Sequence, residues 1–103
     1  MIMMMSGIKP HETKIVGQWI EQDEHVVGDE NCQRIEHLTR QVLKGVEISD
    51  DGWDLLYQDR ADGRYWELIH PAMHLRHGGP PSLIALDPEY ARKKYRLRQV
   101  TLK

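Results

Sequence analysis

The segment from Gly52 to Leu83 constrains the fold most, because it places two strand-like runs around a short turn. Residues 53–58 alternate, with their large apolar side chains on one face. Residues 64–70 are largely apolar on both faces, which is typical of a central strand that is covered on both sides. Between them, Asp62-Gly63 suits the positive backbone φ of a tight turn. We therefore predict antiparallel core strands at 53–58 and 64–70.

A glycine-proline corner, Gly78-Gly79-Pro80-Pro81, follows these runs and resists regular structure. Residues 82–86 then form a third predicted core strand. The chain contains three tryptophans, four tyrosines and no phenylalanine, so a few aromatic side chains must supply the large apolar area of the core. The residues that we expect to act as aromatic anchors and turn positions are Trp19, Trp53, Tyr57, Gly63, Trp66, Gly78, Gly79 and Pro80.

The clearest helix spans residues 29–44, where Asp29 is a good N-cap and apolar residues recur at helical spacing. Gly45 is a natural stop for this helix. Asp87-Pro88 opens a short C-terminal helix over 88–95. The β-branched and aromatic residues of 14–28 form a possible N-terminal hairpin. These elements predict an α+β fold, in which a small, mostly antiparallel sheet packs with one main helix and one short helix.

The length of 103 residues suits one domain, which we assign to residues 10–95. We expect residues 1–9 to be a disordered N-terminus and residues 96–103 to be a basic tail. The apolar start of the chain has no basic region of the kind that opens a secretory signal. Cys32 is the single cysteine, so no intramolecular disulfide can form. Both features fit a cytoplasmic protein.

Charge is distributed unevenly along the chain. All sixteen acidic residues precede residue 91, against eight basic residues in the same part, whereas six basic residues and no acid follow it. An acidic body repels phosphate, which argues against direct nucleic-acid binding by that body. The same charge would attract a basic protein partner, although it also serves solubility alone.

Three histidines, His70, His74 and His77, fall within eight residues and raise the question of a metal site. Pro71 prevents a helix from aligning their rings, and the local pattern matches no structural zinc site. We therefore expect these histidines to have surface or loop-packing roles. We predict no metal and no cofactor.

Glu67 is the strongest candidate for acid–base chemistry, because it lies in a strand beside aromatic residues. The alternative, which we favour, is that it pairs with Arg64 or Arg60 across a hairpin. Cys32 lies on the apolar stripe of the predicted helix, where a buried thiol is usually inert. The sequence therefore predicts no catalytic residues and no enzymatic activity.

An ordered set of residues resembles the twenty-seventh family of immunity proteins found beside bacterial polymorphic toxins. The similarity covers about residues 9–95 and is carried mainly by aromatic residues, turn glycines and prolines. The motifs are Glu12-Thr13-x-x-Val16-Gly17-x-Trp19, Val26-Val27-x-Asp29, Arg34-Ile35-x-x-Leu38, Gly52-Trp53-x-x-Leu56-Tyr57-x-Asp59, Asp62-Gly63-Arg64-x-Trp66-Glu67-Leu68, Pro71, Gly78-Gly79-Pro80-Pro81-x-Leu83 and Ala91-x-x-Lys94-Tyr95.

The resemblance implies a small cytoplasmic protein that binds and neutralises a cognate toxin domain, with an acidic surface blocking a basic partner. We expect no direct nucleic-acid or membrane partner. The candidate partner-binding residues lie mostly on turns: Asp50, Asp51, Asp59, Asp62 and Glu67, with Asp23, Glu24 and the loop from His74 to His77 as weaker candidates. The alternatives are a non-catalytic regulatory or scaffold module, and a small-ligand-binding domain built around the tryptophans.

Overall fold

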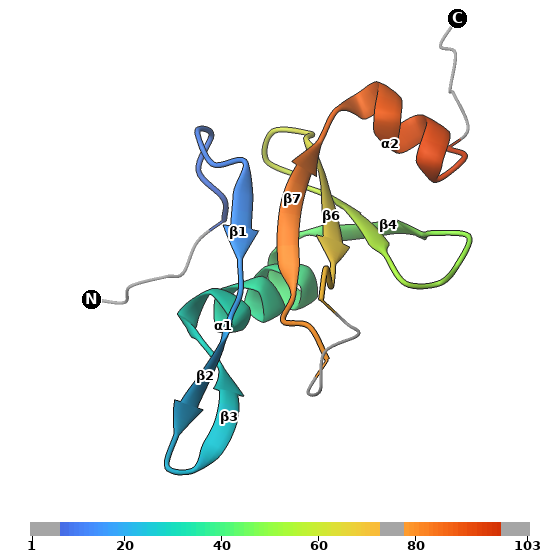
Figure 1. Ribbon diagram of the computed structural model, residues 1–103. Coiled ribbons are helices and arrows are strands. Elements are labelled where there is room, and N and C mark those ends of the chain that lie inside the picture. The colour runs from blue at the N-terminus through green and yellow to red at the C-terminus, as the bar shows by residue number, and fades with distance from the viewer. Residues whose placement is uncertain (1–6, 73–77, 98–103) are drawn as a thin grey trace, which may run out of the picture.

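A computed structural model describes residues 7–72 and 78–97, in which a five-stranded antiparallel sheet and a separate two-stranded hairpin are joined to two helices (Figure 1). The order of strands in the large sheet is β1-β7-β6-β5-β4. The elements are β1 (Lys14–Val16), β2 (Trp19–Gln22), β3 (His25–Gly28), α1 (Glu30–His37), the π-helical turn η1 (Leu38–Val42), β4 (Lys44–Ile48), β5 (Leu55–Gln58), β6 (Tyr65–Ile69), β7 (Ser82–Leu86) and α2 (Pro88–Lys94).

The predicted α+β class and the three core strands are confirmed. β5, β6 and β7 pair in antiparallel register, with Tyr57 opposite Trp66 and Trp66 opposite Ala85. β6 lies at the centre of the sheet, as its two apolar faces predicted. The turn before β6 contains Gly63 at a φ of 81°, a conformation that glycine adopts without steric cost.

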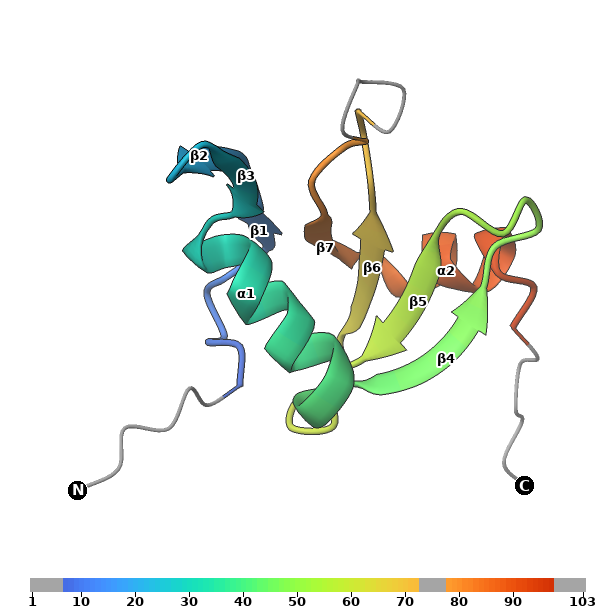
Figure 2. The same ribbon diagram turned by 90° about the horizontal axis from the view of Figure 1, so that it is seen from below.

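The sheet separates two small cores, because successive residues of a strand point to opposite faces. Trp66 belongs to the larger core, which packs under α1 with Ile35 and Leu38. The next residue, Glu67, faces α2, where Leu56, Ala91 and Tyr95 form the smaller core. Figure 2 shows α1 and α2 on opposite faces of the sheet. Each helix therefore covers one face of β6.

The main helix is shorter than predicted. Its N-cap is Asp29, whose carboxylate accepts a hydrogen bond from the Cys32 N–H at 2.9 Å, as expected. The helix then continues as η1 and ends at Leu43, which is extended (φ −85°, ψ 154°). The predicted stop, Gly45, lies instead within β4, a strand that the sequence analysis missed. β4 forms because its backbone pairs with β5, with Gly45 opposite Tyr57.

The N-terminal hairpin is shorter than the predicted range 14–28, because residues 14–16 form a separate strand of the large sheet. β1 pairs with β7 at the edge of the large sheet, and only β2 and β3 form a hairpin. Gly17 separates β1 from β2, and its N–H donates to the Pro81 carbonyl at 2.8 Å. A Cβ at Gly17 would lie 2.6 Å from the Cys32 sulfur, so only glycine lets the chain pass here. The β2–β3 hairpin projects from the body in Figure 1.

The ends of the chain fall only partly within the described residues. Ile8, inside the segment expected to be disordered, is buried in the core under α1. Asp87 caps α2 through hydrogen bonds from the Glu89 and Tyr90 N–H groups, and Pro88 occupies the first turn, as predicted. Most of the predicted basic tail lies outside the described residues.

The three tryptophans have different environments. Trp66 is fully buried, but the side chains of Trp19 and Trp53 are 39% and 61% exposed. The expectation that Trp53 anchors the core is therefore wrong. β5 begins only at Leu55, and Trp53 lies in the preceding loop, where its backbone N–H donates a hydrogen bond to the Asp51 carboxylate. An alternating pattern that starts outside the strand does not fix the direction of its first side chain.

Candidate functional site

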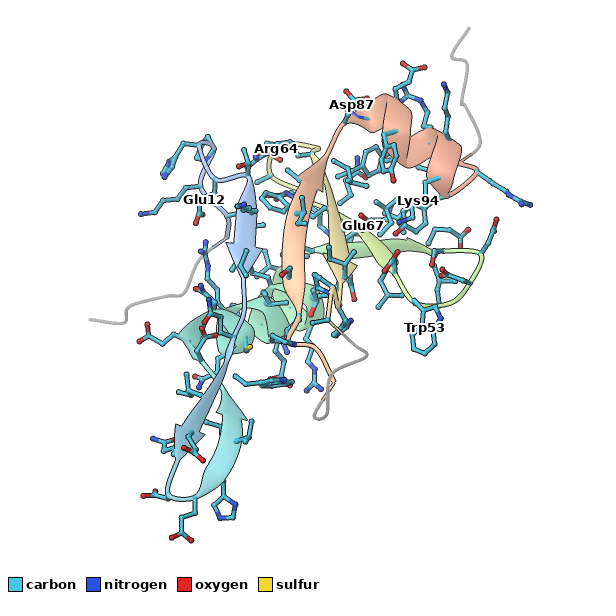
Figure 3. The ribbon with its side chains drawn as sticks, viewed as in Figure 1. Glu12, Trp53, Arg64, Glu67, Asp87 and Lys94 are labelled. Atoms are coloured by element: carbon cyan, nitrogen blue, oxygen red, sulfur yellow. The ribbon has the colours of Figure 1, made fainter. Side chains whose placement is uncertain are left out.

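The most concentrated polar cluster lies between β6 and α2. The Glu67 carboxylate is 6% exposed and accepts hydrogen bonds from the Tyr95 hydroxyl, at 2.7 Å, and from the Lys94 ammonium. Lys94 also donates to the Asp54 carboxylate at 2.9 Å. Figure 3 shows Glu67 and Lys94 directed toward each other from the sheet and the helix. The cluster thus ties α2 to the centre of the sheet.

The electrostatics of this cluster favour a structural role. Burial alone lowers the pKa of Lys94, but its hydrogen bonds to Glu67 and Asp54 outweigh burial and raise that pKa above its usual value. Burial and the adjacent Glu67 carboxylate both raise the pKa of the Tyr95 hydroxyl. Lys94 therefore stays charged and Tyr95 stays neutral near pH 7. The predicted structural pairing of Glu67 is correct, but its partners are Lys94 and Tyr95 rather than Arg64 or Arg60.

Arg64 instead holds the N-terminal segment. Its guanidinium pairs with Asp62 at 2.8 Å and donates to the backbone carbonyls of Glu12 and Lys9. It also lies over the Trp66 ring, 4.9 Å from the centroid. Asp62, a predicted partner-binding residue, is thus on the surface and already has an internal partner.

Asp59 is not on the surface. It is 3% exposed, and its Oδ1 accepts a hydrogen bond from the Ala61 N–H at 2.8 Å. Its Oδ2 has no hydrogen-bond partner within the described part of the chain. The residue lines a hollow of about 570 Å³ between the 59–61 turn and residues 7–10. Asp59 and Glu67, both predicted to contact a partner, are therefore buried in the free chain.

Four of the candidate partner-binding residues are exposed on two other turns. Asp50 and Asp51 lie in the β4–β5 loop, where Asp50 pairs with Arg96 at 2.8 Å. Asp51 accepts hydrogen bonds from the Ser49 hydroxyl and the Trp53 N–H, which hold its pKa below the usual value. Asp23 and Glu24 form the tip of the β2–β3 hairpin, both with positive φ, at 52° and 67°.

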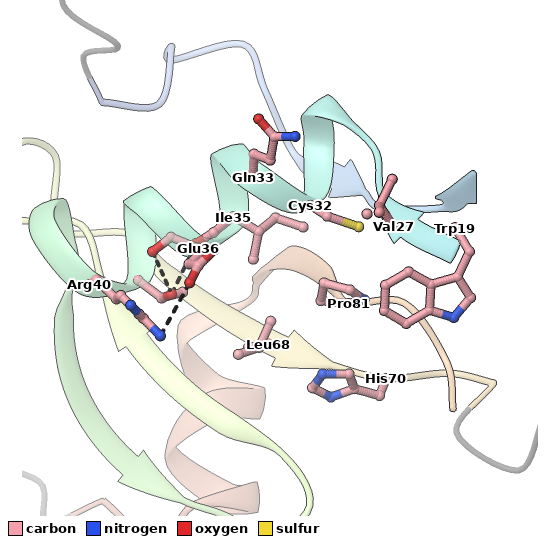
Figure 4. A pocket seen from close by; sticks show the side chains of 12 residues that line it. Trp19, Val27, Cys32, Gln33, Ile35, Glu36, Arg40, Leu68, His70 and Pro81 are labelled. Atoms are coloured by element: carbon pink, nitrogen blue, oxygen red, sulfur yellow. Dashed lines mark hydrogen bonds and ion pairs between the residues drawn. The ribbon is translucent and has the colours of Figure 1, made fainter. Parts of the chain in front are cut away.

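A pocket of about 510 Å³ opens between α1, the base of the β2–β3 hairpin and the end of β6 (Figure 4). Trp19, Cys32 and His70 line it, together with Leu68 and Pro81. Burial is the main cause that raises the pKa of the Cys32 thiol, so the sulfur is protonated at neutral pH and is a weak nucleophile. The pocket therefore combines apolar side chains with the polar residues Glu36, Arg40 and His70, and its thiol is unreactive at neutral pH.

Comparison of the sequence with protein families gives one decisive result. The model of Immunity protein 27 matches residues 21–87, nearly two thirds of the chain. The chain belongs to the Immunity protein 27 family. No curated protein and no solved structure matches the chain significantly.

The match to Immunity protein 27 runs from the tip region of the β2–β3 hairpin to the end of β7. It therefore includes the Asp23-Glu24 tip, the β4–β5 loop and the lining of the pocket under α1 except Trp19. Within the described residues, no group of three or more His, Cys, Asp or Glu side chains is arranged to hold a metal ion. His74 and His77 lie outside those residues. No described helix is long and apolar enough to cross a membrane.

Two features of this Immunity protein 27 chain were missed from the sequence. Lys94 and Tyr95 were placed in a C-terminal helix without a role, although their spacing from Ala91 already puts them near one helical face. The exposure of Trp53 was also missed. The polar residues Ser49, Asp50, Asp51 and Gly52 before Trp53 were the available signal that the loop extends this far.

Proposed function

We propose that the chain is a non-catalytic inhibitor that binds a cognate bacterial toxin domain in the cytoplasm and neutralises it. The observation that carries this proposal is the Immunity protein 27 match across the hairpin, main helix and central strands. The family's description implies protection against a toxin, and direct binding of that toxin is the simplest way for a small protein to provide it. The structure is compatible with a binding role, because several acidic residues are exposed on turns, where a partner can reach them.

The absence of an assembled catalytic group among the described residues supports binding over catalysis. Glu67 is buried against Lys94 and Tyr95, and Cys32 carries a raised pKa. For Glu67 to act as a general acid or base, its carboxyl group would have to reach a substrate. A carboxylate enclosed by its own lysine and tyrosine does not meet that requirement.

Charge gives the proposal a mechanism. The part of the chain before residue 91 has twice as many acidic as basic residues. A toxin that acts on nucleic acid needs a basic active site, since its substrate is a polyanion. An acidic inhibitor would be steered toward such a site and would cover it.

Co-expression with the toxin domain encoded in the adjacent gene tests this function. We expect the chain to restore growth of cells that make the active toxin and to co-purify with an inactive toxin variant. A toxin from an unrelated system serves as the control and should be neither bound nor neutralised. If the adjacent toxin still arrests growth and no complex forms, the proposed function is wrong.

A further inference from the structure

We propose that one edge of the molecule, which we call the tryptophan edge, is the surface on which the partner docks. It consists of Trp19, His70, Trp53 and the Gly78-Gly79 backbone. Its occupant is a basic protein surface that carries an apolar side chain. This inference rests on the proposed function and adds to it the location of the interface.

The tryptophan edge is continuous across elements far apart in sequence. The pocket under α1 is lined by Trp19 and His70. A second hollow of about 290 Å³ is lined by the same His70 together with Trp53, Gly78 and Gly79. The Trp19 indole N–H donates to the Gly78 carbonyl at 2.8 Å, which fixes one side of the edge. His70 therefore joins two adjacent hollows that have a tryptophan at either end.

Large apolar side chains are exposed at this edge and on the neighbouring hairpin. Trp53 is 61% exposed, and Ile20 and Val26 on the hairpin are 45% and 42% exposed. A solitary two-stranded hairpin is marginal in water, so a partner that covered its exposed apolar residues would stabilise it. Tryptophan is enriched among the residues that dominate binding energy, because it buries a large area at low entropic cost.

Charge complementarity identifies the occupant. Residues 15–33, which contain Trp19, include five acidic residues and no lysine or arginine. Residues 45–59, which contain Trp53, include three exposed acidic residues, Glu47, Asp50 and Asp51, and no lysine or arginine. Both segments that form the ends of the edge are therefore acidic. Apolar anchors between acidic flanks have the composition of an interface with a hydrophobic centre and a polar rim.

A basic protein fits this surface better than a second copy of the chain. Two copies that met through this edge would bring acidic flanks together, and like charges across an interface are unfavourable. Nucleic acid is excluded from the edge for the same reason, since it is a polyanion. The toxin domain of the proposed function is the remaining partner of suitable chemistry.

Trp53→Ala is the central variant, because this side chain is exposed and its loss should leave the fold intact. The probe is the catalytically inactive toxin domain from the adjacent gene, with affinity measured by calorimetry. We expect Trp53→Ala to weaken binding about tenfold or more, as for an interface hot spot. Tyr90→Ala is the matched control, since Tyr90 is 52% exposed and lies on α2. It should bind within about twofold of the wild type.

A second pair of variants tests the acidic flank. Asp23→Asn combined with Glu24→Asn removes two charges from the hairpin tip, and asparagine tolerates the positive φ of both positions. We expect this double variant to weaken binding about tenfold. Glu89→Lys changes the net charge by the same amount on α2 and should have a much smaller effect. Shielding of the exposed tryptophans, Trp19 and Trp53, from iodide quenching in the complex provides an independent readout.

The outcomes separate this inference from the proposed function. If the wild type does not bind the toxin, the function fails and the inference fails with it. A second outcome is that the wild type binds the toxin, and that Trp53→Ala and the tip variant bind it as well as their controls do. In that case the proposed function stands and the proposal of the tryptophan edge is wrong. If the free chain is a dimer that Trp53→Ala dissociates, the edge joins two copies and the proposal is also wrong.

Discussion

At the residue scale, Glu67 shows how a strand can carry a charge into the interior. Its neighbour Trp66 fills the core under α1, so alternation turns Glu67 toward α2. Hydrogen-bond donors reduce the cost of burying a carboxylate, and here Lys94 and Tyr95 supply them. The sequence shows the alternation but not these donors, because α2 is distant in the chain and its packing against β6 is a tertiary contact.

We expect Glu67→Gln to lower the free energy of unfolding by about 1–3 kcal/mol, because Lys94 loses its most buried partner. Tyr95→Phe should cost about 1 kcal/mol, since it removes one hydrogen bond and keeps the ring. Urea denaturation measures both changes. Glu36→Gln is the control, because the Glu36–Arg40 pair is exposed and should contribute below about 0.5 kcal/mol. Equal effects at Glu67 and Glu36 would contradict the role given to the buried cluster.

Trp53 illustrates the opposite error at the same scale. Its size and its alternation with Leu55 and Tyr57 favoured the core, but the loop before β5 places it in solvent. Large aromatic residues are usually buried, so an exposed one is informative. The sequence shows that residue 53 is a tryptophan, but the exposure of this side chain depends on where β5 begins.

At the element scale, the sequence predicted those parts of the fold that depend on residues close together in the chain. The caps of both helices, the Gly63 turn and the three core strands follow from nearby residues. The existence of β4 and the pairing of β1 with β7 could not be predicted in the same way. β1 and β4 are the edge strands of the sheet. β1 pairs with the distant β7, whereas β4 pairs with the next strand, β5, through a register shift between Gly45 and Glu47 that interrupts its alternation. Weak periodicity in a short edge strand leaves its pairing to the tertiary fold.

The N-terminal segment is joined to α1 by a charged pair that should make stability depend on pH. Arg34 donates two hydrogen bonds to the Glu12 carboxylate, at 2.8 and 2.7 Å, and lowers the pKa of Glu12 from 4.5 to about 2. A lowered pKa contributes stability that is complete above pH 4.5 and is lost as the pH falls toward 2.

Unfolding of the wild type and Glu12→Gln at several pH values checks this effect. The two side chains are 22% and 21% exposed, so we expect the wild type to be more stable by about 1–2 kcal/mol at pH 6. The difference should shrink between pH 4.5 and 2, where the wild-type carboxylate becomes protonated. A difference that stays constant down to pH 2 would contradict the ion pair as its source.

At the scale of the whole molecule, the uneven charge predicts a salt-sensitive association. The Debye length falls from about 30 Å at 0.01 M salt to about 3 Å at 1 M, which screens long-range attraction. We expect the association rate constant with the toxin domain to fall about tenfold or more between low salt and about 0.5 M salt, with little change in dissociation. Stopped-flow fluorescence measures both rates. An association rate that is unchanged over this range would remove electrostatic steering from the account.

The central claim is that this member of the Immunity protein 27 family neutralises a toxin by binding it. Titration of the purified toxin domain with the purified chain, with toxin activity as the readout, tests this claim most directly. The account predicts that activity falls linearly and disappears near one molar equivalent, and that Tyr90→Ala gives the same curve whereas Trp53→Ala needs a large excess. Full toxin activity in the presence of excess wild-type chain would contradict it.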